Sequence, residues 1–109
     1  MFKVSVMYPN ENGAQFDFDY YRATHIKMAE EAMRPFGLVR VIVEKGVSGG
    51  AGQPAPYICV THLFFEREEG YEQSIEAHGP KLRADFVNYT NLSPVRLFSE
   101  VLEDKVFGD

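Results

Sequence analysis

The sequence predicts an α+β domain with the element order βαββαβ. Two kinds of pattern lead to this prediction. Four stretches rich in β-branched and aromatic residues have the composition of strands, and two intervening stretches have the periodicity or composition of helices. The chain has 109 residues, of which 45% are hydrophobic and 25% charged, as expected for one globular domain. We therefore expect a single domain over residues 1–109.

The first strand and the first helix are the clearest elements. Apolar residues alternate over residues 2–8, and Pro9-Asn10 with the turn sequence Asn12-Gly13 ends this strand. A helix follows, with Asp17 or Asp19 as its N-terminal cap. We expect this helix to end near Arg34, because the residue before a proline is disfavoured in helical geometry.

Two further strands are predicted at residues 37–44 and 57–65, joined by the Gly- and Pro-rich stretch 46–56. This connection enters a strand and lacks the Gly-Lys-Ser/Thr ending of a phosphate-binding loop. We interpret it as a hairpin connection, with a lid over a pocket as the alternative, since long loops in small domains are often functional.

The second helical region has two pieces in this prediction. Residues 66–76 favour a helix but contain Gly70, and Gly79-Pro80 separates them from a further helical piece at 81–87. Pro94 then precedes a fourth strand at 95–102, and the last residues are expected to fray. The resulting order is that of the ferredoxin-like fold, a four-stranded antiparallel sheet with both helices on one face.

The face of the sheet away from the helices also needs a cover. Both parities of the first and third strands are largely apolar, which indicates that both faces are buried. A second copy of the chain, related by a two-fold axis, is the simplest cover. The sequence therefore predicts a homodimer formed through the sheet.

Composition excludes several partners. The net charge is −5, and 11 scattered basic residues face 16 acidic ones, so we expect no nucleic-acid partner. No apolar run approaches the ~20 residues of a membrane helix, and the strand-like start at Met1 is unlike a signal peptide. The single cysteine, Cys59, cannot form an internal disulfide and fits a reducing, cytoplasmic location.

His25 is the strongest candidate for chemistry. On a helical projection it shares one face with Phe18, Tyr21, Met28, Ala29 and Ala32, opposite a charged face. Histidine titrates nearest neutral pH, so a pocket-facing His25 suits acid/base catalysis. The structural alternative is a core histidine with its hydrogen bonds satisfied. The Tyr21 hydroxyl, one turn earlier, could contact His25 or a ligand, or be part of the core.

The remaining polar candidates are less certain in their placement. His62 belongs to one face of the third strand, but parity does not decide which face, so it lines either the pocket or the subunit interface. His78 could cap a carbonyl or reach the pocket mouth. Asp85 is interpreted first as a structural acid of the Asn88–Asn91 turn, and second as a carboxylate that orients His25 or His78. No metal site is expected, because no His-x-His, His-x₃-His or Cys-x-x-Cys pair occurs.

Several motifs give the chain a family resemblance. They are Val4–Asn10, Phe-Asp-x-Asp-Tyr-Tyr-x₃-His at 16–25, Lys-Gly-x-x-Gly-Gly at 45–50, the strand around 62–64, His78, Ala-Asp-x-x-Asn-Tyr-Thr-Asn at 84–91, Pro94 and 99–101. Together they resemble the EthD family of dimeric α+β barrel proteins, over nearly the whole chain. The resemblance implies sheet-to-sheet dimers with a small-molecule pocket between helices and sheet. It supports His25 and Tyr21 as catalytic and Tyr8, His62, His78 and Tyr89 as substrate-binding residues.

The resemblance carries a reductase name for some members, but this sequence does not support reduction. It has no Gly-x-Gly-x-x-Gly after a strand, no flavin or nicotinamide motif and no cysteine pair, so no cofactor is expected. We expect cofactor-independent acid/base chemistry, of the isomerase, cyclase or monooxygenase type, on a small apolar organic catabolite. The alternatives are a non-catalytic small-ligand binding protein and an accessory subunit of a degradative oxygenase pathway. The sequence leaves the substrate and the reaction open.

Overall fold

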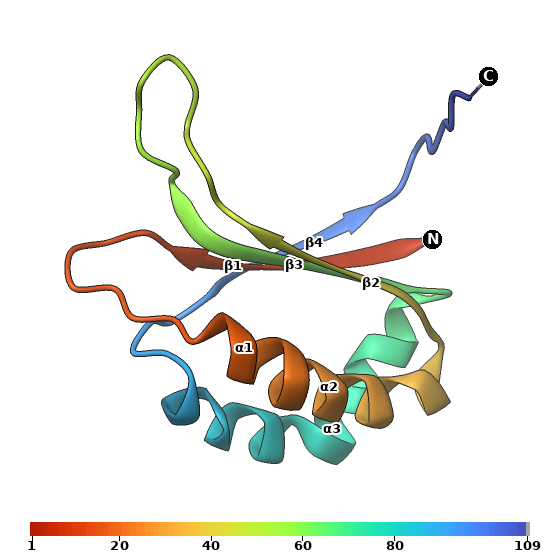
Figure 1. Ribbon diagram of the computed structural model, residues 1–109. Coiled ribbons are helices and arrows are strands. Elements are labelled where there is room, and N and C mark those ends of the chain that lie inside the picture. Colours follow the sequence, from red (N-terminus) through yellow and green to blue (C-terminus); the bar gives the residue numbers. More distant parts are fainter. Residues whose placement is uncertain (109) are drawn as a thin grey trace.

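The computed structural model describes residues 1–108 and has the predicted α+β architecture, with helices on one face of a sheet (Figure 1). The sheet has four antiparallel strands in the order β2-β3-β1-β4. Its strands are β1 (Phe2–Pro9), β2 (Leu38–Lys45), β3 (Tyr57–Phe65) and β4 (Val95–Glu100). The predicted strands are confirmed to within two residues at each end. Within residues 1–108, no helix has the length and apolar composition needed to cross a membrane.

The first helix is continuous but changes its winding. It comprises α1 (Phe18–Tyr20), the π-helical turn η1 (Tyr21–His25), α2 (Ile26–Met33) and the 3₁₀ turn η2 (Arg34–Phe36). Of the two predicted caps, Asp17 is the one used, and its carboxylate accepts from the Tyr20 amide. Gly37 then ends the segment in the left-handed region, at φ 102°.

The second helix differs from the prediction. It is one helix, α3 (Glu68–Ala84), followed by the 3₁₀ turn η3 (Phe86–Asn88). Gly70 does not break it, because that glycine allows close packing: a Cβ there would lie 2.0 Å from the carbonyl oxygen of Phe36. Pro80 is tolerated because the preceding Gly79 has no Cβ to clash with the proline ring in helical geometry.

The core lies between the helices and one face of the sheet, in two clusters. The first is mostly aliphatic and includes Val4, Leu63 and Phe65, under α2 and α3. The second is aromatic and centres on Tyr8, Tyr21 and Tyr89, at the end of the sheet where the first helix begins. A cavity described below adjoins both clusters.

The connection 46–56 and the C-terminal residues 101–108 extend on the other side of the sheet, away from the helices (Figure 1). A bridge between Gly50 and Gln53 closes the tip of this connection. None of its residues lines the cavity. The alternative interpretation as a lid over the pocket of the same chain is therefore wrong, because the loop leaves β2 on the opposite face.

Candidate functional site

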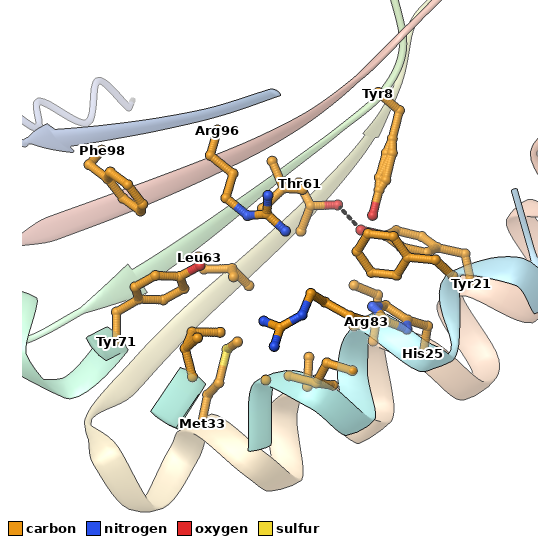
Figure 2. A pocket seen from close by; sticks show the side chains of 17 residues that line it. Tyr8, Tyr21, His25, Met33, Thr61, Leu63, Tyr71, Arg83, Arg96 and Phe98 are labelled. Carbon is orange, nitrogen blue, oxygen red and sulfur yellow. Dashed lines mark hydrogen bonds between the residues drawn. The ribbon is translucent and has the colours of Figure 1, made fainter. Parts of the chain in front are cut away.

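A cavity of about 320 Å³ lies between the sheet and the helices. Its walls are mostly apolar and come from β1 and β3 above and from α2 and α3 below (Figure 2). Several polar side chains interrupt the apolar walls. Four of them are buried, namely Tyr8, Tyr21, His25 and Thr61, and the others are Tyr71, Arg83 and Arg96. An apolar cavity with a few convergent polar groups is the usual form of a small-molecule site.

His25 and Asp85 form a hydrogen-bonded pair beside this cavity. The distance from Nδ1 of His25 to Oδ2 of Asp85 is 2.9 Å, and each side chain is 8% exposed. A carboxylate only accepts, so Nδ1 carries the proton and donates it. No other residue of 1–108 bonds the second ring nitrogen, and no polar side-chain atom in this range is buried without a partner. Nε2 is therefore an open acceptor at the cavity that His25 lines.

Asp85 is fixed by more than the histidine. Its Oδ1 accepts from the Tyr20 hydroxyl at 2.6 Å and from the Asn88 amide at 2.9 Å. Burial raises the pKa of Asp85, but these bonds and the one from His25 outweigh it, so the pKa lies below its usual range. Both interpretations of Asp85 hold in part: the carboxylate ties the turn at Asn88 and also orients His25. Of the two histidines named in the second interpretation, His25 is the one that Asp85 contacts.

Burial also decides the charge of the histidine. It lowers the pKa of His25, and the hydrogen bond and negative charge of Asp85 raise it only partly. The imidazole is thus neutral near pH 7, which leaves Nε2 able to accept a proton. Asp85 would stabilise the imidazolium that forms, as a buried carboxylate does in hydrolytic triads.

An aromatic cluster holds the His25 ring in place. Tyr21 stacks on the imidazole with 5.5 Å between ring centroids and 14° between planes, and Tyr89 and Phe86 pack on its other sides. The Tyr21 hydroxyl bonds Thr61 Oγ1 at 2.6 Å, not His25 (Figure 2). The Tyr8 hydroxyl bonds that of Tyr89 at 2.8 Å. Burial raises the pKa of all three phenols, so they remain protonated at neutral pH.

The predicted site residues separate into two groups. His25, Tyr21 and Tyr8 line the cavity, and Tyr89 lies behind Tyr8. His62 and His78 lie elsewhere, so the expectation that they contribute to this cavity was wrong. His62 is on the outer face of β3, where Nδ1 meets Ser5 Oγ at 3.0 Å and Nε2 meets Glu44 Oε1 at 2.9 Å. His78 is exposed on α3, at a separate shallow depression.

Sequence reasoning missed the two arginines of the cavity. A pattern was available for each. Arg96 shares parity with Phe98 on β4 and pairs with Val6 of β1, whose side chain faces the helices. Arg83 follows Ile75 and Gly79 at four-residue intervals on α3, and both of these also line the cavity.

The cavity offers no evident metal centre. Within residues 1–108, no group of three or more His, Cys, Asp or Glu side chains is placed to hold a metal ion. Burial also raises the pKa of the Cys59 thiol to about 11, which disfavours the thiolate that binds metals.

Fold and site together define a small ferredoxin-like α+β protein with a His–carboxylate pair in an apolar cavity. Structural comparison is more specific. The chain is 32% identical to an EthD-like protein from Ralstonia eutropha JMP134, over 95% of this chain and 94% of that one, with a TM-score of 0.90. The chain belongs to the EthD-like family.

More distant structures share the fold alone. An ethyl tert-butyl ether D (EthD) family protein from Bacillus halodurans C-125 is 18% identical over 94% of this chain and 99% of its own, with a TM-score of 0.70. A dimeric ferredoxin-like protein from an uncultured marine organism is 12% identical over 98% and 100%, with a TM-score of 0.56. No family model and no curated protein sequence matches the chain.

Proposed function

We propose that the protein is a cofactor-independent acid/base enzyme that moves a proton on a small organic molecule. The observation that carries this proposal is the neutral His25, held by Asp85 through Nδ1, with Nε2 open to an apolar cavity. Nε2 takes a proton from a carbon next to a carbonyl group and returns one to the same or a neighbouring carbon. Isomerisation and cyclisation reactions both contain such a step.

The surroundings suit this chemistry. The His25–Asp85 pair is itself buried, each side chain 8% exposed, which strengthens the attraction between Asp85 and an imidazolium formed during the reaction. Asp85 and the stacked Tyr21 fix the ring, so its lone pair keeps one direction. A positioned general base contributes about 10²–10⁴-fold. In this proposal Tyr21 positions His25 and does not itself transfer a proton, because burial raises the pKa of its phenol and keeps the hydroxyl protonated near neutral pH.

Proton exchange into deuterated water tests the proposal without knowledge of the natural substrate. The probes are phenylacetone and an unsaturated γ-lactone, and NMR follows deuterium entering the carbon next to the carbonyl. We expect exchange above the background with the wild type and about a 10²-fold or larger decrease in the excess rate for His25→Gln. Asp85→Asn should decrease it less, since the ring nitrogen remains.

The matched control is His78→Gln, which removes an exposed histidine outside the cavity and should leave exchange unchanged. Equal exchange by wild type and His25→Gln would refute the proposal. Binding of the probes in the cavity without any exchange would instead favour the non-catalytic ligand carrier, which needs the cavity but not an open Nε2.

We also propose a homodimer through the outer face of the sheet. Met7, Ile42, Val60, Phe64 and Leu97 lie at outward positions of four adjacent strands, and Leu97 is 52% exposed. The polar row across this face, Ser5–His62–Glu44, satisfies both ring nitrogens of His62 internally. This row can therefore be covered without leaving the imidazole unpaired.

The single buried free thiol, Cys59, supports a cytoplasmic location.

A further inference from the structure

Two arginine side chains point into the cavity from opposite walls. Arg83 comes from α3 and Arg96 from β4, and both line the cavity at its solvent-exposed part, where their guanidinium groups are directed into it (Figure 2). Within residues 1–108, neither forms an ion pair with an acidic side chain or a side-chain hydrogen bond. Arginine remains charged at any physiological pH. The cavity therefore holds two positive charges without a countercharge from the described chain.

The charge of the lining is opposite to that of the molecule. The protein has 16 acidic and 11 basic side chains, yet the cavity lining includes two arginines and no Asp or Glu. Asp85 lies behind His25 and is already occupied by three donors. A negatively charged ligand would thus meet attraction at the cavity and general repulsion elsewhere.

The position of Arg83 depends on a neighbouring glycine. A Cβ on Gly79 would lie 2.9 Å from Nη1 of Arg83 and 3.0 Å from a methyl group of Ile75. The absence of a side chain at 79 therefore makes the space in which the guanidinium lies beside the cavity. Gly79 therefore has two effects in α3: it accommodates Pro80 and it leaves room for the side chain of Arg83.

Arg96 has a structural alternative. β4 is an edge strand, and an inward charge on an edge strand protects it against pairing with other sheets. That explanation does not extend to Arg83, which is on a helix, and does not predict any preference among ligands. The two explanations of Arg96 are therefore separable by experiment.

We propose that the cavity binds a small organic anion, an apolar molecule whose carboxylate is held by Arg83 and Arg96 while its body lies against the apolar walls toward His25. Guanidinium groups bind carboxylates in paired, charge-assisted hydrogen bonds. This substrate class rests on the proposed function, because the anchored anion presents its carbon to Nε2 of His25. The arginines bind and position the ligand, and His25 alone takes the proton.

A matched pair of probes tests the charge preference. 1-Naphthaleneacetate and 1-naphthaleneacetamide have nearly the same shape, and only the first is charged. We expect the wild type to bind the anion about tenfold to a hundredfold more tightly by calorimetry. Arg83→Gln and Arg96→Gln should each reduce this ratio, and the double variant should abolish it while binding the amide as before. Added salt should weaken the binding of the anion and leave the binding of the amide unchanged.

Arg22→Gln is the matched control, since Arg22 lies on the exposed side of the first helix and should leave the ratio unchanged. Equal affinity for both probes in the wild type, or a preference that survives the double variant, would overturn the proposal. Aggregation of Arg96→Gln with an unchanged ratio would assign Arg96 to edge protection and likewise contradict its role here.

His25→Gln separates this inference from the proposed function. It should keep the preference for the anion and lose proton exchange. If the wild type prefers the anion but never catalyses exchange, the proposed ligand class stands and the proposed enzymatic function is rejected. If the wild type catalyses proton exchange without preferring the anion, the proposed enzymatic function stands and the anionic substrate class is rejected.

Discussion

His25 keeps its imidazole neutral at a position where a charge would be expected beside a carboxylate. Burial lowers its pKa, and Asp85 opposes this effect without reversing it. The same pair is part of a larger hydrogen-bond network, because Asp85 also accepts hydrogen bonds from the Tyr20 hydroxyl and the Asn88 amide. Tyr21 and Tyr89 face the ring but remain uncharged near neutral pH.

A pH dependence of stability follows from this pKa. Below the ordinary histidine pKa of about 6.5, the unfolded chain binds a proton that the folded protein rejects at His25. The free energy of unfolding should therefore fall as the pH decreases from about 6.5 toward the lowered folded value. The pKa of Asp85 is also lowered, so it adds a loss of the same sign at more acidic pH, below about 4.

Denaturant unfolding of the wild type, His25→Gln and His78→Gln between pH 8 and 5 measures this dependence. His25→Gln should flatten the slope just below pH 6.5, and His78→Gln should keep it. A slope that persists in His25→Gln would mean that the folded protein protonates His25 as readily as the unfolded chain does.

Among single elements, the first helix changes its winding within its buried face. Across the π turn, the amide of Ile26 donates to the carbonyl of Tyr21, five residues back. Tyr21 and His25 are in stacking contact on this turn, and Ile26 follows them into the buried face with Ala29 and Met33. The regular helical projection predicts His25 and Ala29 inside but misses Ile26, because it assumes one winding throughout. π turns occur often at functional sites.

The start of α3 depends on Gly70. In an ordinary helix, Gly→Ala stabilises by up to about 1 kcal/mol. At Gly70 we expect the opposite, a loss of roughly 1–3 kcal/mol, because the added methyl would lie 2.0 Å from the carbonyl oxygen of Phe36. Urea unfolding of Gly70→Ala measures the effect, with Gln73→Ala on the exposed side of α3 as the control. A more stable Gly70→Ala protein would contradict the close approach.

At the scale of the whole molecule, the outer face of the sheet carries exposed apolar residues, among them Val95 and Leu97. The C-terminal residues run along the same side as the connection 46–56 (Figure 1), and Leu102, Val106 and Phe107 are largely exposed there. Exposed apolar residues on both the sheet and its flanks are typical of a surface that another chain covers. They are the main physical support for the proposed homodimer.

Charge substitutions on this face test the dimer. Light scattering of the wild type should give twice the 12.4 kDa mass of the chain at micromolar concentration. Leu97→Lys and Val60→Lys together should give a monomer, because a dimer would then bury unpaired charges. Val87→Lys, at an exposed apolar residue in η3, should not change the mass. A wild-type mass of one chain would rule out a stable dimer.

The sequence by itself determined the order of the strands and helices, the family and the inward direction of His25. The order of elements and the direction of His25 follow from local composition and periodicity, and the family from its resemblance in short motifs, all of which are properties of short segments. Only the tertiary structure decided which distant groups meet: Asp85 with His25, 60 residues apart, and Arg83 with Arg96 around one cavity. It also placed His62 on the outer face. Alternation along a strand separates two faces but does not mark the one that receives the helices, because that depends on how the whole chain packs.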